Sequence, residues 1–184
     1  MATTTQAPGA TSSWNIDASH SHIEFAVKHL MISTVKGRFA DVEGQLAIVD
    51  GNPSASSVSV VIKAATIDTR TEQRDEHLRS ADFLDVGNFP EITFKSTRIE
   101  GDSAEFKVTG DLTIRGVTKE ITLDATSEGQ GKDPWGGERI GFSAKTKFDR
   151  RDWGLQYNQA LEAGGVVVGH EVKVSIELEA VKQA

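Results

Sequence analysis

The sequence predicts an all-β fold, and a single antiparallel β-barrel of about eight strands satisfies it best. Three observations support this prediction. Apolar and polar residues alternate along most of the chain, short turn motifs separate the alternating segments, and a length of 184 residues fits one domain. A sandwich of two sheets would show the same pattern, but a closed barrel leaves no strand edge exposed, which favours the barrel.

The alternation marks strands that are buried on one face only. In residues 22–29, Ile23, Phe25 and Val27 share one face, and His29 continues it. We therefore expect His29 to point into the barrel, either as a hydrogen-bonded core residue or as a polar group that meets a ligand. Segments with the same period follow at 42–48, 58–62, 92–94, 106–114, 121–123 and 171–180.

Short glycine-containing turns lie between these segments, as in hairpin connections. They are Asp50-Gly51-Asn52-Pro53, Glu100-Gly101-Asp102 and Arg115-Gly116. Gly44 and Gly110 instead fall on the inward faces of strands. A glycine at such a position either leaves room for a ligand or lets the sheet bend at a barrel corner. Together with Ala64, these small residues favour an open interior.

One segment departs from the alternation. Thr69-Arg70-Thr71-Glu72 has the pattern of a helix capping box, so a short helix is expected near residues 70–80. Arg74, His77 and Leu78 fall on one face of this helix by their i, i+3, i+4 spacing. A helix this polar fits either a cover over the barrel mouth or an ordinary surface crossover.

Charge and composition exclude several classes of protein. The net charge is −7, from 20 basic and 27 acidic residues, which argues against nucleic acid as a partner. The absence of cysteine excludes disulfides and thiolate chemistry. Residues 1–13 are expected to be a disordered lead before a single domain at 14–184. This lead lacks the basic start and apolar run of a secretion signal, so we expect a cytoplasmic protein.

Catalytic motifs are missing from the sequence. It has no Gly-x-Ser-x-Gly nucleophile elbow and no glycine-rich phosphate loop in a strand–helix setting. Metal-assisted catalysis through His20, His22 or His77 stays open, because His20 and His22 are two residues apart and would share a strand face. That face is polar and no second closely spaced histidine pair exists, so we expect no metal and no cofactor.

Several segments resemble those of one known family in order and spacing. They are Asp17-x-x-His20-Ser21-x-Ile23-x-Phe25-x-Val27-x-His29-Leu30, Gly37-x-Phe39, Ile67-x-Thr69, Arg74-Asp75-x-His77-Leu78-Arg79-Ser80-x-Asp82-Phe83-Leu84-Asp85, Phe89-Pro90-x-Ile92-x-Phe94-x-Ser96, Gly110-Asp111-Leu112-Thr113-Ile114-x-Gly116-Val117-Thr118-Lys119 and Asp149-Arg150-x-Asp152-Trp153-Gly154. On these motifs, which run from about Trp14 to Ala180, the chain resembles the YceI-like family.

The resemblance implies a lipocalin-like barrel of eight antiparallel strands, about wide enough to hold one small ligand. Members of this family resemble carriers of polyisoprenoid chains, including isoprenoid quinone precursors, and of other long amphiphiles such as fatty-acid derivatives. Many members carry a secretion signal, from which this sequence departs. The family offers no catalytic residue set that maps onto the chain.

We therefore expect a non-enzymatic protein that binds, transports or stores one long-chain amphiphile inside the barrel. The residues expected to line a tunnel through it are Phe25, Val27, His29, Phe39, Leu46, Phe83, Phe94, Phe106, Leu112, Ile114, Phe142, Phe148 and Trp153. A diphosphate or carboxylate head should be held by cations at the mouth. The candidates are Arg74, His77, Arg79, Arg150 and Arg151. Arg150 and Arg151 could equally pair with Asp149 or Asp152.

Two alternative hypotheses stay open at this point. One is the metal-assisted enzyme, and the other is a stress-related interaction module that acts through its surface or as a dimer. In the second case the barrel would be filled by its own side chains, because no guest needs the space. The eight Phe residues could either line a cavity or fill it. The oligomeric state is also open, a homodimer included.

Overall fold

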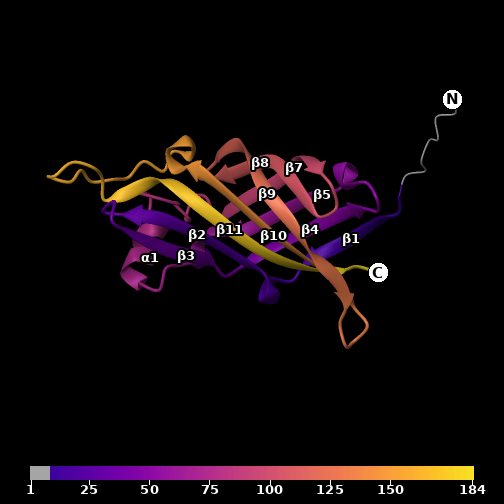
Figure 1. Ribbon diagram of the computed structural model, residues 1–184. Coiled ribbons are helices and arrows are strands. Elements are labelled where there is room, and N and C mark those ends of the chain that lie inside the picture. The colour runs from indigo at the N-terminus through magenta and orange to yellow at the C-terminus, as the bar shows by residue number, and fades with distance from the viewer. Residues whose placement is uncertain (1–8) are drawn as a thin grey trace, which may run out of the picture.

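We describe residues 9–184 from a computed structural model, and within this range eight strands close into an antiparallel barrel (Figure 1). In order around the barrel they are β1 (Thr11–Ile16), β4 (Val42–Val49), β5 (Ser57–Lys63), β7 (Glu91–Gly101), β8 (Glu105–Ile114), β9 (Val117–Lys132), β10 (Glu138–Asp149) and β11 (Val168–Lys182). The ring closes where β1 pairs with β11, with Trp14 opposite Lys182. The predicted barrel is confirmed, and the sandwich is excluded because strand pairing continues all the way around.

The α-helix of the described residues, α1 (Glu72–Arg79), lies within the predicted range of 70–80. The predicted capping box is wrong, because the N-cap is Thr71 and its side chain makes no capping hydrogen bond. Thr69 instead donates its N–H and its hydroxyl to Asp75 Oδ1, at 2.9 and 2.5 Å. Asp75 is buried, so this contact ties the helix to the chain that enters it. Over residues 9–184, no helix is long and apolar enough to cross a membrane.

Three further strands extend the wall at one end of the barrel: β2 (His22–His29), β3 (Ser33–Phe39) and β6 (Ile67–Asp68). This is possible because β11 is long enough to pair with β1 near its C-terminal end and with β2 along the rest of its length. The chain bends between β1 and β2 at a 3-10 turn, Ala18–His20, capped by Asp17. The end that carries the β2–β3 hairpin and α1 is termed the mouth end; it lies at the left of Figure 1.

The predicted disordered lead at residues 1–13 is partly wrong. Residues 1–8 lie outside the described part of the chain, but β1 already begins at Thr11. Its first residues pair with β4, so that Thr11 faces Val49 and Ser13 faces Ala47. The indole N–H of the buried Trp14 donates to Ser12 Oγ of the same strand at 2.8 Å. Sequence composition missed the strand because its first residues are polar on both faces.

The inward glycines do not open the interior. A Cβ on Gly110 would lie 2.4 Å from the carbonyl oxygen of Lys95 and 2.6 Å from the ring of Phe94. A Cβ on Gly44 would lie 2.5 Å from the carbonyl oxygen of Ser59. Gly110 also lies beside a register shift between β7 and β8, so its role is to let the sheet bend. The expectation that these glycines leave room for a ligand is therefore wrong.

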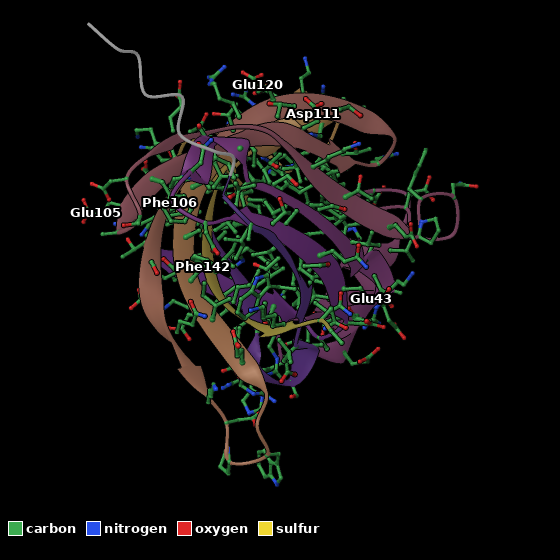
Figure 2. All side chains as sticks on the ribbon, turned by 90° about the vertical axis from the view of Figure 1, so that its right-hand side faces the viewer. Glu43, Glu105, Phe106, Asp111, Glu120 and Phe142 are labelled. Carbon is green, nitrogen blue, oxygen red and sulfur yellow. The ribbon has the colours of Figure 1, made fainter. Side chains whose placement is uncertain are left out.

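Side chains fill the barrel at the end opposite the mouth. Trp14, Leu46 and Ala180 form a buried cluster there. Phe106 and Phe142 meet edge to face across the interior, with ring centroids 5.9 Å apart. Figure 2 looks into this end and shows both rings inside the circle of strands. The strand pattern predicts which residues point inward, but this end is a packed core rather than a passage.

Candidate functional site: an apolar cavity at the mouth end

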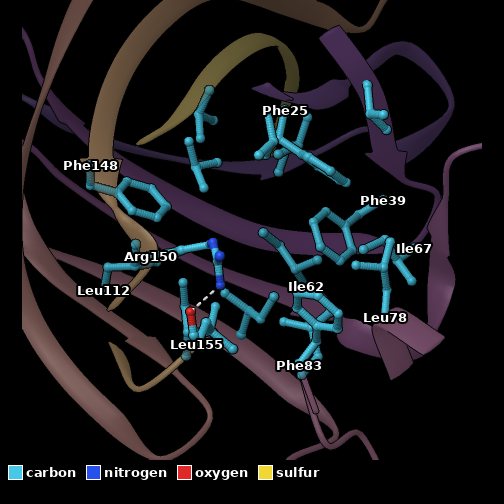
Figure 3. Close-up of a pocket in the computed structure, with 18 of the residues that line it drawn as sticks. Phe25, Phe39, Ile62, Ile67, Leu78, Phe83, Leu112, Phe148, Arg150 and Leu155 are labelled. Atoms are coloured by element: carbon cyan, nitrogen blue, oxygen red, sulfur yellow. Dashed lines mark hydrogen bonds between the residues drawn. The ribbon is translucent and has the colours of Figure 1, made fainter. Parts of the chain in front are cut away.

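An apolar cavity of about 440 Å³ occupies the mouth end of the barrel. Its wall comes from strands β2, β3 and β5–β11, from α1 and residues 83–84 after it, and from Arg150 and the segment 155–167 that precedes β11. Cavities of this size commonly hold small molecules or cofactors. Figure 3 shows the side chains that point into it, most of them aliphatic or aromatic.

The cavity exists because the inward side chains do not fill the space between the opposite walls of the barrel here. Along β11, Val172, Val174, Ile176 and Leu178 alternate with outward polar residues and all line the cavity. Each of these four retains some accessible surface although it faces inward. In a filled core these side chains would touch one another and be fully buried. The barrel interior is therefore open at this end, contrary to the hypothesis of a filled barrel.

Most of the residues predicted to line the interior do so. Those that line the cavity are Phe25, Val27, His29, Phe39, Phe83, Phe94, Leu112, Ile114 and Phe148. Their strands alternate as the sequence predicts, and His29 continues the inward face of β2. The head-group candidates Arg74, His77 and Arg150 also line the cavity. Which of these residues touch a ligand stays a prediction.

Four of the predicted lining residues lie elsewhere: Leu46, Phe106, Phe142 and Trp153. Leu46, Phe106 and Phe142 belong to the filled end, so the predicted tunnel through the whole barrel is wrong and the cavity is confined to the mouth end. Trp153 packs behind the cavity wall, because its indole N–H donates to the carbonyl oxygen of Leu112 at 2.9 Å. Its ring lies against Phe148, with centroids 4.7 Å apart.

Arg150 is the buried cation of the cavity wall and is only 3% exposed. It lies in a 3-10 turn, Arg150–Trp153, that follows β10. Its guanidinium donates to four backbone carbonyl oxygens: Gly169 at 2.8 Å, Tyr157 at 3.0 Å, Val168 at 3.3 Å and Leu155. Figure 3 shows the group pointing into the pocket beside Leu155. These contacts hold the guanidinium in place and tie the segment 155–169 to the barrel.

The charge on Arg150 has no carboxylate within hydrogen-bond distance among the described residues. Burial lowers the pKa of its guanidinium, and the charge of nearby Asp149 partly opposes this shift. An arginine has five N–H donors, and the four carbonyl contacts leave one hydrogen of Nη1 without an acceptor in residues 9–184. The guanidinium also faces the Phe83 ring at 6.0 Å. The mostly apolar wall thus contains a buried, positively charged donor in Arg150.

Helix α1 covers part of the mouth. Of the two roles expected from the sequence, it is therefore a cover over the mouth and not an ordinary surface crossover. Arg74, His77 and Leu78, predicted to share a face, all line the cavity. The His77 ring packs against Phe83 and Tyr157, with centroids 5.1 and 4.7 Å away. The side chain of His77 is still 40% exposed. Because His77 lines the cavity and also meets solvent, the cavity reaches the surface here.

Two head-group candidates do not reach the cavity. Arg79 donates to the carbonyl oxygens of Ala65 and Ile67, at 2.8 and 3.2 Å, and pairs with Glu72. Arg151 turns outward and pairs with Asp149 at 2.6 Å. The expected pairing with Asp149 is therefore confirmed for Arg151, whereas Arg150 bonds only to carbonyl oxygens.

Several lining residues were missed from the sequence. Those on strands, such as Ile62, Val174 and Ile176, follow the same alternation as the predicted ones and could have been found by it. Leu155, Tyr157 and Val167 lie in a segment with no regular period before β11, and only their apolar character hints at burial. Lys28 is a further cation at the mouth.

His20 and His22 do not form the pair that the alternative hypothesis of a metal-assisted enzyme requires. His20 ends the 3-10 turn and His22 begins β2, so the two do not share a strand face. His20 instead lies with Asp17 and Glu179, whose ligand atoms are within 4.8 Å of one another. Arg139 already donates to Asp17 at 2.8 Å and to Glu179 at 2.6 Å. A metal ion would have to displace this guanidinium, and His22 and His77 are not part of the group.

The Arg139 network predicts acid-sensitive stability. Hydrogen bonds from Ser19 and Arg139 lower the pKa of Asp17, and Arg139 with the Gly137 N–H lowers the pKa of Asp133. Both carboxylates are ionised in the folded state at a pH where unfolded aspartates take up protons. We therefore expect the free energy of unfolding to fall as the pH drops below 3.8, the ordinary pKa of aspartate. In urea denaturation at a series of pH values, Arg139→Met should lose less unfolding free energy on acidification than the unsubstituted protein. An equal loss in both proteins would contradict this role of Arg139.

A protein-family model described as the YceI-like domain matches residues 14–180. The chain belongs to the YceI-like family. The YceI-like motifs found in the sequence therefore fall within a match that spans the barrel. Protein YceI of Salmonella newport strain SL254 is 40% identical over 181 residues, which are 98% of this chain and 92% of that protein. Protein YceI of Escherichia coli O157:H7 is 40% identical over 91% of this chain and 84% of its own length.

Solved structures of several proteins have the same fold. The YceI protein of Campylobacter jejuni has a TM-score of 0.70 and 36% identity, over 85% of this chain and 90% of its own. BcnA of Burkholderia cenocepacia has a TM-score of 0.78 and 20% identity, over 89% and 98%. A polyisoprenoid-binding domain from Saccharophagus degradans, implicated in plant cell wall breakdown, has a TM-score of 0.68 and 16% identity, over 94% and 99%. The latter two likenesses concern the fold alone.

Proposed function

We propose that this YceI-like protein binds one long-chain amphiphile, with the apolar tail in the cavity of the mouth end. The ligand class is a polyisoprenoid, an isoprenoid quinone or its precursor, or a fatty-acid derivative, and the protein carries or stores it without chemical change. The observation that carries the proposal is the apolar cavity of about 440 Å³, open at one end and blind at the other. The polyisoprenoid-binding domain of Saccharophagus degradans, which shares the fold, supports the ligand class.

The energetics of burial support a chain-like ligand. Transfer of a methylene from water to an apolar site is worth about 0.8 kcal/mol. About a dozen buried carbons would therefore exceed the ~8 kcal/mol of micromolar affinity, and the excess offsets the entropy lost on binding. The wall supplies aliphatic and aromatic contacts along the whole cavity, as Figure 3 shows. Such a site discriminates among amphiphiles by the length and shape of their apolar tails.

The polar groups of the cavity favour a ligand with an oxygen-rich head. Arg150 lines the cavity, and four carbonyl contacts fix its guanidinium while one Nη1 hydrogen has no acceptor among the described residues. A donor that is held in advance loses little entropy on binding. Lys28, Arg74 and His77 add positive or polarisable groups nearer the surface. We infer that the head, a carbonyl or an anionic group, lies on this side of the cavity and the tail points toward the filled end.

Native mass spectrometry tests the proposal. Protein purified without detergent should carry one molecule of a prenyl or acyl compound, released on denaturation and identified by its mass. After removal of this lipid by organic extraction and refolding, the protein should take up one equivalent of farnesol or of a long-chain fatty acid. Protein that loads neither chain, although it is folded by circular dichroism, would remove the basis of the proposal.

A further inference from the structure

The tip of the β2–β3 hairpin carries exposed apolar side chains at the mouth end. Leu30, Met31 and Ile32 are 36%, 55% and 81% exposed. Within residues 9–184 the other large exposed hydrophobic side chain is Trp135, in the β9–β10 hairpin. A single exposed apolar residue needs no explanation, but three in a row on a protruding turn do.

The backbone of this turn is unfavourable for the residues that occupy it. The N–H of Ile32 donates to the carbonyl oxygen of His29 at 3.1 Å, and the two residues between them have positive φ angles, 52° at Leu30 and 63° at Met31. Hairpin turns with positive φ at both central residues strongly favour Asn and Gly. Bulky apolar side chains are thus present where the turn conformation disfavours them, which points to a role beyond forming the turn.

The tip forms part of the rim of the cavity. Lys28 and His29, directly before the turn, line the cavity. The N–H of Leu30 donates to the carbonyl oxygen of Val167 at 2.9 Å, and Val167 lines the cavity from the segment before β11. Figure 1 shows the β2–β3 hairpin and this segment projecting at the same end of the barrel. The exposed tip and the apolar interior are therefore continuous.

We propose that this lip, residues 30–32 with the adjoining Val167, inserts shallowly into the surface of a phospholipid bilayer. The proposal rests on the proposed function, because it supplies the route by which a water-insoluble chain enters the cavity. A lip seated among acyl chains would let the tail slide from the bilayer into the barrel without crossing water.

Charge supports a phospholipid surface as the partner. The whole chain has a net charge of −7, yet Lys28 and Lys36 are the charged side chains between Phe25 and Gly37. Both lysines are exposed on the hairpin that carries the lip. They suit the phosphate groups of phospholipids. The segment 155–168 contributes one charged residue, Glu162.

Insertion is tested with a tryptophan placed in the lip. Ile32→Trp adds an indole at the tip, and vesicles of phosphatidylcholine with brominated acyl chains quench tryptophan fluorescence only where it enters the hydrocarbon. We expect the Ile32→Trp protein to lose fluorescence relative to unbrominated vesicles. The unsubstituted protein is the control, because Trp14 and Trp153 are buried and Trp135 lies outside the lip. If brominated vesicles do not quench the indole introduced by Ile32→Trp, the proposal is overturned.

Transfer kinetics provide the second test. The double variant Leu30→Asn, Met31→Gly removes two apolar side chains and replaces them with the residues that the turn prefers, so it should fold with equal or higher thermal stability. We expect uptake of a dansyl-labelled farnesyl chain from phosphatidylcholine vesicles to slow about tenfold. Uptake of the same probe from dilute aqueous solution should be unchanged. Trp135→Ser, the control variant, should alter neither rate.

The outcomes separate the two proposals. If no protein takes up the probe from either source, the proposed ligand class is wrong. If all variants load equally fast from vesicles, binding of the chain stands and the membrane lip is wrong. If the double variant instead changes the oligomeric state in size-exclusion chromatography, the lip contacts a second copy of the chain and the membrane proposal is overturned.

Discussion

Val174→Trp should strongly reduce loading of a prenyl or acyl chain while leaving the barrel folded. Val174 lies in the middle of β11, pairs with Phe25 and faces the cavity. An indole there takes the space of at least about three methylenes of a bound tail. At about 0.8 kcal/mol each, this predicts at least a ~50-fold loss of affinity for farnesol in a fluorescence competition assay.

The matched control is Ser175→Trp, one residue further along the same strand. Ser175 points outward and is exposed, so an indole there should leave affinity and stability almost unchanged. The free energy of unfolding separates an open from a filled interior. The Val174→Trp indole should enter the empty space at a cost under about 1 kcal/mol, whereas overpacking of a filled core costs about 1–3 kcal/mol or more. If Val174→Trp binds farnesol with unchanged affinity, the tail of the ligand lies outside this cavity.

Arg150→Met should destabilise the protein by about 3–5 kcal/mol. Methionine fills much of the same volume, but it cannot donate to the carbonyl oxygens of Leu155, Tyr157, Val168 and Gly169. A hydrogen bond from a charged donor contributes about 1.5–3 kcal/mol to stability. The expected loss is smaller than the sum over four bonds, because water can bond to the carbonyl oxygens that lose the guanidinium. The segment 155–168 has little regular structure, so its attachment to the barrel depends on this side chain. Urea denaturation measures the effect.

Arg151→Met is the control for this prediction, because it removes a neighbouring guanidinium of the same size. Arg151 is exposed and bonds only to Asp149 and its own turn, so its loss should cost at most about 1 kcal/mol. Equal destabilisation by the two variants would contradict the structural role given to Arg150. Arg150→Met can also be tested for binding at a low temperature at which it remains folded. A loss of affinity for a fatty acid that is larger than the loss for the fatty alcohol of the same length would support Arg150 as the head-group contact.

The sequence predicted the inward face of each strand well, because burial on one side of a sheet forces a period of two. Phe25, Val27 and His29 on β2, and Phe94 on β7, lie where this period places them. It also located α1 and the side chains of its inward face. Most errors fall where a residue's contacts depend on chain segments remote in sequence, as for Phe106 and Phe142 at the filled end. The capping box is a local error, because the Thr69 hydroxyl bonds to Asp75 instead of capping the helix.

Alternation cannot tell a cavity wall from a packed core. Phe94 and Phe106 both point inward, yet Phe94 lines the cavity and Phe106 meets Phe142 at the filled end. The difference arises from what stands opposite each ring once the barrel has closed. The same holds for Arg150 and Arg151, which are adjacent in the chain but turn to opposite sides of the wall.

By itself, the sequence determined an antiparallel barrel of the YceI-like family, its helix, and the set of side chains that point inward. These follow from periodicity, turn chemistry and motif spacing, all of which are local along the chain. The tertiary structure alone decided that one end is filled and the other hollow, that Arg150 is the buried cation of the cavity, and that Leu30, Met31 and Ile32 project from its rim. These depend on distances between segments far apart in the chain, which only closure of the barrel fixes.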